Sequence, residues 1–495
     1  MLNLKYVPIR SFNENIAYVH TDCEAYKTDD IRTMTRVEIH GGAVTLNAFL
    51  QVTDDISLVQ PDELGLNAEA FDMLGLPEGA RVTMVLADAP QSIKAVKRKI
   101  QGNILTAGEY KSIVGDILQR KYSNIDIAAF LSAFSAFSTA PEIVSFVQAL
   151  LFDKNLFWDE EDIVADCYTL GDIPGNNTDL LVTAIAAAYG MPMPKVVVPE
   201  VSSCFGSAHT MRVFADIDKN PVELARLIKE NRGAVVSYKT LSVYKALSAL
   251  QSVAAYLNIK DEAYTIVRLL ALKAAAGITH LVVDIPVGPK TLIKTSQQAI
   301  HARKLIEYAG DVLGLKTDVV ITDGREPVGA GVGALLEARD IRRILRNKDN
   351  APKGLLEKAL FLAGRVLEFD PAMRGGQGYE AAKEILTSGR ALEAFDKIIT
   401  AQGRAEQSDF GTLIRDVTAE NSGKIMAIDN KIIRKIAMLA GAIQYSGAGV
   451  YLFKKVGDEV AKGDVLYRII SCDSADFAVV NSFADADNGY DIARD

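Results

Sequence analysis

Short apolar runs alternate with helical stretches through the middle of the chain. The runs at 195–198, 280–285 and 317–322 have the length and the β-branched content of buried strands. Helical periodicity marks residues 180–189 and 295–309. Parallel strands need long, usually helical crossovers, so this alternation predicts an α/β fold with a mostly parallel sheet.

The segments before and after this alternating region show other sequence patterns. Short β patterns with glycine turns predict a β-rich N-terminal domain, and apolar residues spaced by three or four predict a helical lobe. Strands around a short helix predict a C-terminal α+β domain. The expected division is 1–88 for the N-terminal domain, 89–155 and 241–276 for the helical lobe, 156–240 and 277–420 for the α/β lobe, and 421–495 for the C-terminal domain.

The C-terminal domain carries two further expectations. Residues 455–466 form a turn-rich stretch that we interpret as a hairpin, similar to a segment of biotinyl/lipoyl-like hammerhead folds. No lysine lies between two methionines there, so we do not expect a carrier function. From Ser474 the tail is acidic, and we expect it to fray.

Composition narrows the functional classes. A net charge of −9 disfavours nucleic acid as a partner but leaves room for a small anionic substrate in a locally positive cleft. The four cysteines are far apart and form no CxxC pair, so we expect no metal site, no disulfides and a cytoplasmic location. We find neither an apolar run of ~18 residues nor a signal-peptide pattern, and we expect no membrane partner and no cofactor.

The loop before the helix at 180–189 contains closely spaced glycines. Backbone N–H groups at a helix start can bind an anion without a side-chain charge. A tight strand-to-helix turn would use the same residue types, so both interpretations stand. The candidate ligand-binding residues here are Thr169, Gly171, Asn176 and Thr178.

Two more loops are candidates. The stretch 201–210 offers hydroxyls, a thiol and an imidazole, which can hold phosphate or ribose and move a proton; it can equally be a polar loop with a helix N-cap at Ser207. Its candidate residues are Ser203, Ser207, His209 and Thr210. The glycines at 322–333 have the wrong spacing for a dinucleotide site and favour a closely packed backbone.

Several segments, taken together and in order, resemble the thymidine/pyrimidine nucleoside phosphorylases, and more closely the AMP phosphorylases, which have an extra N-terminal domain. The most specific segments are 174–176, 206–211, 280–288, 322–338 and 455–466. The resemblance implies a helical lobe and an α/β lobe with a cleft between them. It also implies phosphorolysis of an N-glycosidic bond, giving free base and a pentose 1-phosphate, by a homodimer or larger homo-oligomer.

The phosphate loop departs from the family's motif D-K-H-S-x-G-G-x-P-G-N-K-T. The first lysine and the histidine are replaced by Cys167 and Tyr168, and the later lysine by Asn177. Thr169 keeps the serine's hydroxyl, and Asp172 adds a negative charge where the family has glycine. Because Cys167 has no evident base beside it in sequence, we expect a buried thiol rather than a nucleophile.

The second loop and the base-binding side depart as well. The phosphate-contacting threonine corresponds to Ser207, and an arginine and an aspartate of the family correspond to Pro199 and His209. On the base side the resemblance places Lys260, Arg268 and Lys273, with Leu272 at the position of the family's lysine. Asp261, adjacent to the position of a proposed proton-donating aspartate, could still serve as a catalytic residue alongside His209.

These departures leave two hypotheses for function. Losing one charge-assisted contact to phosphate costs roughly 1.5–3 kcal/mol, so losing several lowers a phosphorolysis rate by orders of magnitude. The first hypothesis is a pentosyltransferase of the phosphorylase type with altered site chemistry. The second is a catalytically silent homologue that acts as a scaffold, a regulatory subunit or a ligand-binding protein.

Overall fold

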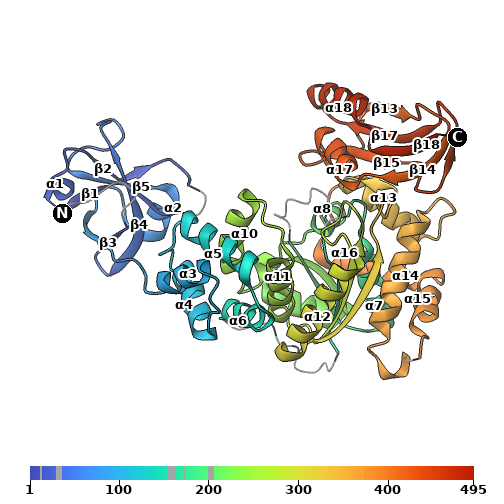
Figure 1. Cartoon of the computed structure of the whole chain (residues 1–495), viewed down its shortest axis with the longest axis horizontal. Coiled ribbons are helices and arrows are strands. Elements are labelled where there is room, and N and C mark those ends of the chain that lie inside the picture. Colours follow the sequence, from blue (N-terminus) through green and yellow to red (C-terminus); the bar gives the residue numbers. More distant parts are fainter. Residues whose placement is uncertain are drawn as a thin grey trace. The chain divides into compact units, whose positions relative to one another are not determined.

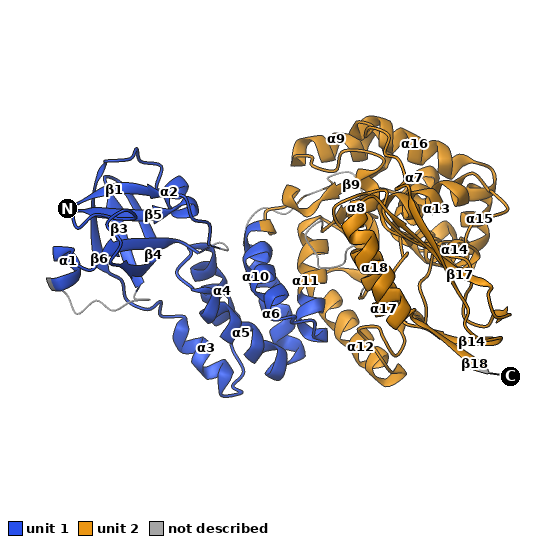
Figure 2. Cartoon of the chain, turned by 90° about the horizontal axis from the view of Figure 1, so that it is seen from above, with its two compact units in different colours: residues 1–152, 245–267 blue, residues 153–244, 268–495 orange. Residues whose placement is uncertain are grey.

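The computed structural model describes residues 1–495 except 12–13, 29–35, 153–155, 157, 159–162, 172, 199–205, 374 and 495. The chain forms two compact units (Figure 2). Unit 1 comprises Met1–Phe152 and Lys245–Val267, and unit 2 comprises Asp153–Tyr244 and Arg268–Asp495. Within the described part of the chain, no helix is both long enough and apolar enough to cross a bilayer.

Unit 1 begins with a closed β-barrel (Figure 1). Around the barrel the strands follow the order β1-β5-β2-β4-β3-β6. Alternate side chains point inward, as Val37 and Ile39 do on β3, and closure pairs the strand edges with one another. The strands are β1 (Leu2–Val7), β2 (Ile16–His20), β3 (Arg36–Gly41), β4 (Val44–Thr53), β5 (Glu63–Asn67) and β6 (Arg81–Leu86); the helices beside them are α1 (Glu24–Thr28) and α2 (Ala68–Leu74).

Helices make up the rest of unit 1. Helix α6 begins with a capping box between Thr139 and Glu142 and has a proline in its first turn. Glu142 is buried and forms an ion pair with buried Lys99 at 2.6 Å. The helices are α3 (Ile93–Ile100), α4 (Ala107–Leu118), α5 (Asn124–Phe137), α6 (Ala140–Leu150), α10 (Tyr244–Tyr256) and the first part of α11 (Glu262–Ala275).

Unit 2 contains two parallel sheets, in agreement with the alternation of strands and helices. One sheet has the order β11-β10-β7, and the other pairs β8 with β9. These strands are β7 (Ala165–Thr169), β8 (Met193–Val197), β9 (Gly233–Ser237), β10 (His280–Val287) and β11 (Lys316–Asp323). The helices are α7 (Thr178–Tyr189), α8 (Ser207–Arg212), α9 (Pro221–Asn231), α12 (Ser296–Leu313), α13 (Ala334–Leu345), α14 (Lys353–Leu367), α15 (Gly378–Thr387) and α16 (Arg390–Gln402).

The C-terminal part of unit 2 has two antiparallel sheets and its own apolar core. Their strand orders are β12-β15-β17-β13 and β16-β14-β18. The elements are β12 (Gly331–Val332), β13 (Leu413–Thr418), β14 (Gly423–Ile428), α17 (Asn430–Leu439), β15 (Gly449–Leu452), β16 (Glu459–Val460), β17 (Val465–Ser471), α18 (Ser474–Ala486) and β18 (Tyr490–Arg494). The hairpin predicted at 455–466 is wrong, because β16 and β17 belong to different sheets.

The prediction that the tail frays from Ser474 is also wrong. Asp473 caps helix α18, and the helix buries Val480 and Ala484 in the core of the C-terminal part. Strand β18 pairs with β14 in an antiparallel register. The prediction relied on the acidic residues of the tail, which say nothing about the apolar side chains of α18 that pack into the core.

Candidate functional site

The loop that leads from β7 into α7 lies in unit 2 and turns at two glycines. Gly171 and Gly175 have φ of +95° and +68°, in the left-handed region that favours glycine. A Cβ on Gly175 would lie 2.8 Å from the Gly331 carbonyl oxygen, and Gly329 N donates to Gly175 O at 3.1 Å. The closely packed backbone predicted for 322–333 is therefore confirmed, and this loop is what it packs against.

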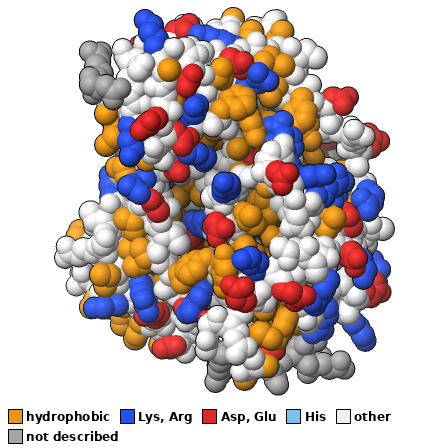
Figure 3. Space-filling view, turned by 90° about the vertical axis from the view of Figure 1, so that its right-hand side faces the viewer, with side chains coloured by type: hydrophobic (Ala, Val, Ile, Leu, Met, Phe, Trp, Pro, Cys, Tyr) orange, Lys and Arg blue, Asp and Glu red, His pale blue; other side chains and the backbone are white. Residues whose placement is uncertain are grey.

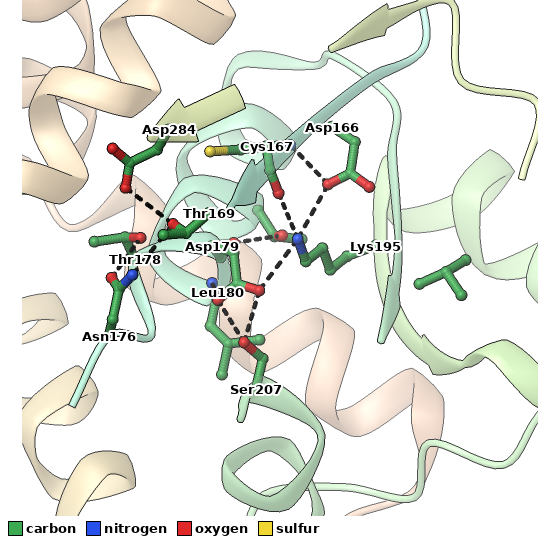
Figure 4. Close-up of polar contacts among 12 residues, drawn as sticks. Asp166, Cys167, Thr169, Asn176, Thr178, Asp179, Leu180, Lys195, Ser207 and Asp284 are labelled. Carbon is green, nitrogen blue, oxygen red and sulfur yellow. Dashed lines mark hydrogen bonds and ion pairs between the residues drawn. The ribbon is translucent and has the colours of Figure 1, made fainter. Parts of the chain in front are cut away.

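Three candidate residues of this loop come together at the start of α7 (Figure 4). Asn176 Nδ2 donates to Thr169 Oγ1 at 3.1 Å, and Thr178 Oγ1 donates to Asn176 Oδ1 at 3.0 Å. Their side chains are neutral, and they lie at the start of a 12-residue helix, where the first backbone N–H groups have no partner within the helix. One of these groups, Leu180 N, donates to Asp179 Oδ1 at 3.0 Å. We call Thr169, Asn176 and Thr178 the hydroxyl cluster.

A carboxylate and a lysine adjoin the hydroxyl cluster. Thr169 Oγ1 donates to Asp284 Oδ2 at 3.1 Å, and Thr322 Oγ1 donates to the other carboxylate oxygen of Asp284. Lys358 Nζ on α14 lies 2.7 Å from Asp284 Oδ2. Sequence reasoning missed this cation because its only link to the loop is through the tertiary fold, and its charge is balanced by Asp284.

On the other side of the loop, a second lysine is paired with two carboxylates (Figure 4). Lys195 Nζ lies 3.3 Å from Asp166 Oδ1 and 3.1 Å from Asp179 Oδ2, and it donates to the Cys167 carbonyl oxygen. The two carboxylates raise the pKa of Lys195 despite its burial, so the ammonium stays charged. Asp179 belongs to the first turn of α7, where an anion is stabilised by the helix dipole.

Asp179 also fixes the second loop. Ser207 Oγ donates to both carboxylate oxygens of Asp179, at 2.7 and 2.6 Å. The N-cap predicted at Ser207 is wrong, because Gly206 is the N-cap and Ser207 is the first residue of α8. The chain thus places its own carboxylate between two candidate phosphate-binding segments, a feature that we did not anticipate.

The remaining candidates of the second loop lie elsewhere. Thr210 Oγ1 donates to Glu337 at 2.8 Å, and Asn177 donates to the same carboxylate oxygen. Burial raises the pKa of Glu337 to about 8. His209 is half-buried, and burial together with the nearby Arg212 lowers the pKa of its imidazole, which is neutral at pH 7. Ser203, Asp172 and Pro199 lie outside the described residues.

Cys167 and Lys273 are both in the core of unit 2. Cys167 is 1 % exposed, and burial raises the pKa of its thiol, so the prediction of a buried, unreactive cysteine is confirmed. Lys273 Nζ lies 2.6 Å from Asp166 Oδ2, and both side chains are fully buried. The ammonium of Lys273 also lies 5.4 Å from the centre of the Tyr168 ring. Lys273 therefore holds β7 in place instead of facing solvent.

The base-side candidates are divided between the units. Lys260 and Asp261 belong to unit 1, and Arg268 belongs to unit 2. Asp261 accepts hydrogen bonds from Ser135 Oγ at 2.5 Å and from Tyr264 N at 2.9 Å, as a residue that caps a helix does. Among the residues that the structure describes, no group of three His, Cys, Asp or Glu side chains is placed to hold a metal ion.

The arrangement around α7 can hold an anion through neutral donors. Hydroxyls, an amide and backbone N–H groups converge there, while Lys195, Lys273 and Lys358 are each paired with an internal carboxylate. Neutral hydrogen bonds contribute about 0.5–1.5 kcal/mol each, less than charge-assisted ones.

Comparison with known proteins gives matches to two protein families and to full-length relatives. Residues 424–493 match the pyrimidine nucleoside phosphorylase C-terminal domain, and residues 93–152 match the helical bundle domain of a glycosyl transferase family. A "Putative thymidine phosphorylase" of Methylococcus capsulatus is 41% identical over 494 residues, covering 99% of this chain and 96% of that protein. A protein of the same name from Bradyrhizobium sp. (strain ORS 278) is 38% identical over 491 residues, with the same coverage.

A solved structure shares the fold. The anthranilate phosphoribosyltransferase of Thermus thermophilus matches with a TM-score of 0.52 and 18% identity, covering 62% of this chain and 99% of that chain. At this identity the match concerns the fold alone. It shows that this chain shares a mixed helical and α/β fold with that protein.

Proposed function

This chain belongs to the thymidine/pyrimidine nucleoside phosphorylase family, and from that premise we propose that it transfers a pentosyl group from a nucleoside or nucleotide to phosphate. In this reaction a phosphate oxygen attacks C1′ of the pentose as the bond from C1′ to the base nitrogen breaks. The products are a pentose 1-phosphate and the free base, which leaves with the bonding electrons and takes up a proton.

The hydroxyl cluster carries the proposal. Thr169, Asn176 and Thr178 lie at the N-terminus of α7, where backbone N–H groups favour an anion. Their hydroxyl groups, which donate to Asp284 and Asn176 in the free protein, would turn toward a bound phosphate. Replacing a charge-assisted contact by a neutral one loses about 1 kcal/mol or more, a factor of about five or more in affinity. We therefore propose that phosphate is bound here, and more weakly than by a loop that keeps its lysines.

The departing base takes up a proton, and a nearby side chain has to supply it. We propose His209, since its neutral imidazole can accept a proton and pass it on. Asp261 is the alternative, although its carboxylate already accepts two hydrogen bonds. On the base side the proposal retains Lys260 and Arg268 as contacts to the substrate.

The surface supports a small-molecule substrate. Figure 3 shows acidic and basic side chains interspersed on one face of the molecule, and the net charge is −9. Proteins that bind nucleic acid generally gather their basic side chains into a patch or stripe. The proposal is therefore restricted to a nucleoside or nucleotide and phosphate, in the cytoplasm.

A second candidate function rests on the internal carboxylates. Asp166, Asp179 and Asp284 already neutralise the three lysines nearest the loop, and Asp179 takes the place of an anion in the first turn of α7. A phosphate dianion entering there meets a carboxylate, which repels it. The alternative is a non-catalytic family member that keeps the fold and acts as a scaffold, a regulatory subunit or a ligand-binding protein.

A phosphorolysis assay distinguishes the two. The full-length chain is incubated with inorganic phosphate and a panel of pyrimidine and purine nucleosides and nucleoside monophosphates, and release of free base is followed. The proposal predicts base release that depends on phosphate and saturates at high concentrations of it. Absence of phosphate-dependent release from every member of the panel would favour the non-catalytic alternative.

A further inference from the structure

Residues 326–331 pack directly on the glycine turn of the loop before α7, and we call them the strap. Val328 N donates to the Pro174 carbonyl oxygen at 3.0 Å. Gly329 N donates to the Gly175 carbonyl oxygen at 3.1 Å. A Cβ on Gly329 would lie 2.8 Å from that oxygen, so the two backbones approach as closely as glycine allows. The position of the glycine turn therefore depends on the position of the strap.

The C-terminal part of unit 2 holds the strap from its other side through Lys455, which lies between β15 and β16. Lys455 Nζ donates to the Gly329 carbonyl oxygen at 2.8 Å and to the Pro327 carbonyl oxygen. The side chain is half-buried, and burial lowers the pKa of its ammonium. A cation withdrawn from water needs acceptors, and the strap provides two of them. Gly329 thus binds the loop through its N–H group and Lys455 through its carbonyl group.

Other contacts hold the two ends of the strap. Glu326 Oε2 accepts a hydrogen bond from Val456 N at 2.7 Å. Asp340 Oδ2 accepts hydrogen bonds from Ala330 N at 2.9 Å and from Gly331 N at 2.7 Å. Because these contacts do not involve the lysine side chain, loss of the ammonium should loosen the middle of the strap without unfolding it.

We propose that Lys455 is a positioning residue for the phosphate site, which fixes the glycine turn before α7 through the strap. This inference rests on the proposed function, since it assumes that phosphate binds at the start of α7. A displacement of ~1 Å at a group that holds a substrate can lower a rate by as much as ~100-fold. The strap contacts the loop before α7, so we expect the loss of Lys455 to impair binding of phosphate and to leave binding of the nucleoside unchanged.

The first test measures phosphorolysis by the full-length chain with phosphate and a nucleoside that the wild type cleaves. Lys455→Met keeps an apolar side chain of similar length and removes the ammonium. We expect the KM for phosphate to rise about fivefold or more, while the KM for the nucleoside stays the same. Loss of folded protein alone would lower the apparent kcat and change neither KM.

Two variants accompany Lys455→Met. Lys455→Arg keeps donors for the strap carbonyl groups and should restore the KM for phosphate. Lys454→Met is the matched control, because the neighbouring Lys454 pairs with Asp464 at 3.4 Å instead of the strap. It should leave both KM values unchanged.

The second test needs no activity and follows amide hydrogen exchange by mass spectrometry. The amides of Val328 and Gly329, which donate to the loop, should exchange about tenfold faster or more in Lys455→Met than in the wild type. Lys454→Met should leave them unchanged. If Lys455→Met fails to fold, Lys455→Gln, whose side chain is one bond shorter, takes its place with the same expected results.

The outcomes separate this inference from the proposed function. If the wild type releases no base in response to phosphate, the proposed function fails, and faster exchange in Lys455→Met would still show that Lys455 fixes the loop. Release by the wild type with an unchanged KM for phosphate in Lys455→Met would overturn the inference and leave the proposed function standing. Unchanged exchange at Val328 and Gly329 would overturn the inference in either case.

Discussion

Lys195 Nζ lies 3.1 Å from Asp179 Oδ2 and so ties strand β8 to the first turn of helix α7. The same carboxylate accepts the hydroxyl of Ser207. In a family whose phosphate loop depends on side-chain cations, this chain has placed a carboxylate at the helix start and a lysine behind it. If phosphate binds at the start of α7 as proposed, this internal carboxylate competes with it.

Removing this carboxylate should improve phosphate binding. Asp179→Asn keeps an acceptor for Ser207 and leaves Asp166 to pair with Lys195, while it frees part of the lysine's charge. We expect phosphate to bind about tenfold more tightly, equivalent to roughly 1.4 kcal/mol. Titration calorimetry measures the affinity for phosphate. The control is Asp311→Asn, which removes one negative charge at an exposed position of α12. Unchanged or weaker binding in Asp179→Asn would show that Asp179 does not oppose the ligand.

The ion pair of Lys273 and Asp166 should matter for stability. Both side chains are fully buried, and their closest atoms are 2.6 Å apart. Lys273→Met leaves the buried Asp166 carboxylate with the more distant Lys195 and the backbone N–H of Cys167. We expect this to lower the free energy of unfolding by about 3–5 kcal/mol. Urea denaturation checks this, with Lys304→Met on exposed α12 as the comparison, which should change stability by less than about 0.5 kcal/mol. Equal stability of the two variants would mean that the pair contributes nothing.

Glu337 should make stability fall as pH rises. Burial raises its folded-state pKa to about 8 from an ordinary 4.5, so the folded chain holds a proton that the unfolded chain has lost. The stabilisation is complete below pH 4.5 and declines between pH 4.5 and 8, by about 5 kcal/mol in total.

Glu337→Gln isolates this effect, because the pH dependence of all other groups cancels in the comparison. The glutamine variant should gain stability relative to the wild type as pH rises toward 8, and the difference should be constant above it. Denaturant unfolding at several pH values measures the difference. A difference that does not change with pH would show that Glu337 titrates normally.

The C-terminal tail should behave as a packed element. Val480 on α18 is fully buried, whereas its neighbour Val479 is 54 % exposed. Val480→Ala should cost about 2 kcal/mol, and Val479→Ala less than about 0.5 kcal/mol. Thermal unfolding of the two variants gives the comparison. A frayed tail would make both substitutions neutral.

The sequence predicted helices, strands and their pairing where the evidence lay within one short segment or one crossover. Apolar runs such as 280–285 became strand β10, and long crossovers made its pairing with β7 and β11 parallel. Closure of the N-terminal barrel depends on the pairing of β1 with β5 and β6, about sixty to eighty residues away, which period-2 patterns do not specify. Period-2 patterns also do not show which distant strand each of β16 and β17 pairs with, so the sequence could not assign them to separate sheets.

The sequence predicted the glycine turn and the hydroxyl residues before α7, and phosphate binding there stays a proposal. The glycines and the hydroxyl cluster follow from one short motif. Lys195, Lys358 and Glu337 come from distant segments, and no sequence pattern indicates which carboxylate each will meet. Asp179 directly follows the loop motif in sequence. Its hydrogen bond with Ser207 depends on the position of the second loop, which only the fold provides.

The most direct test of the central claim is the rate of free-base release as phosphate is varied, compared among the wild type, Thr169→Val and Thr169→Ser. We expect saturation by phosphate in the wild type. Thr169→Val should lower kcat/KM for phosphate about 2- to 12-fold, as loss of one neutral hydrogen bond implies, while Thr169→Ser keeps the hydroxyl and most of the rate. No phosphate-dependent release in the wild type, or equal rates in the wild type and Thr169→Val, would contradict a phosphate site at the start of α7.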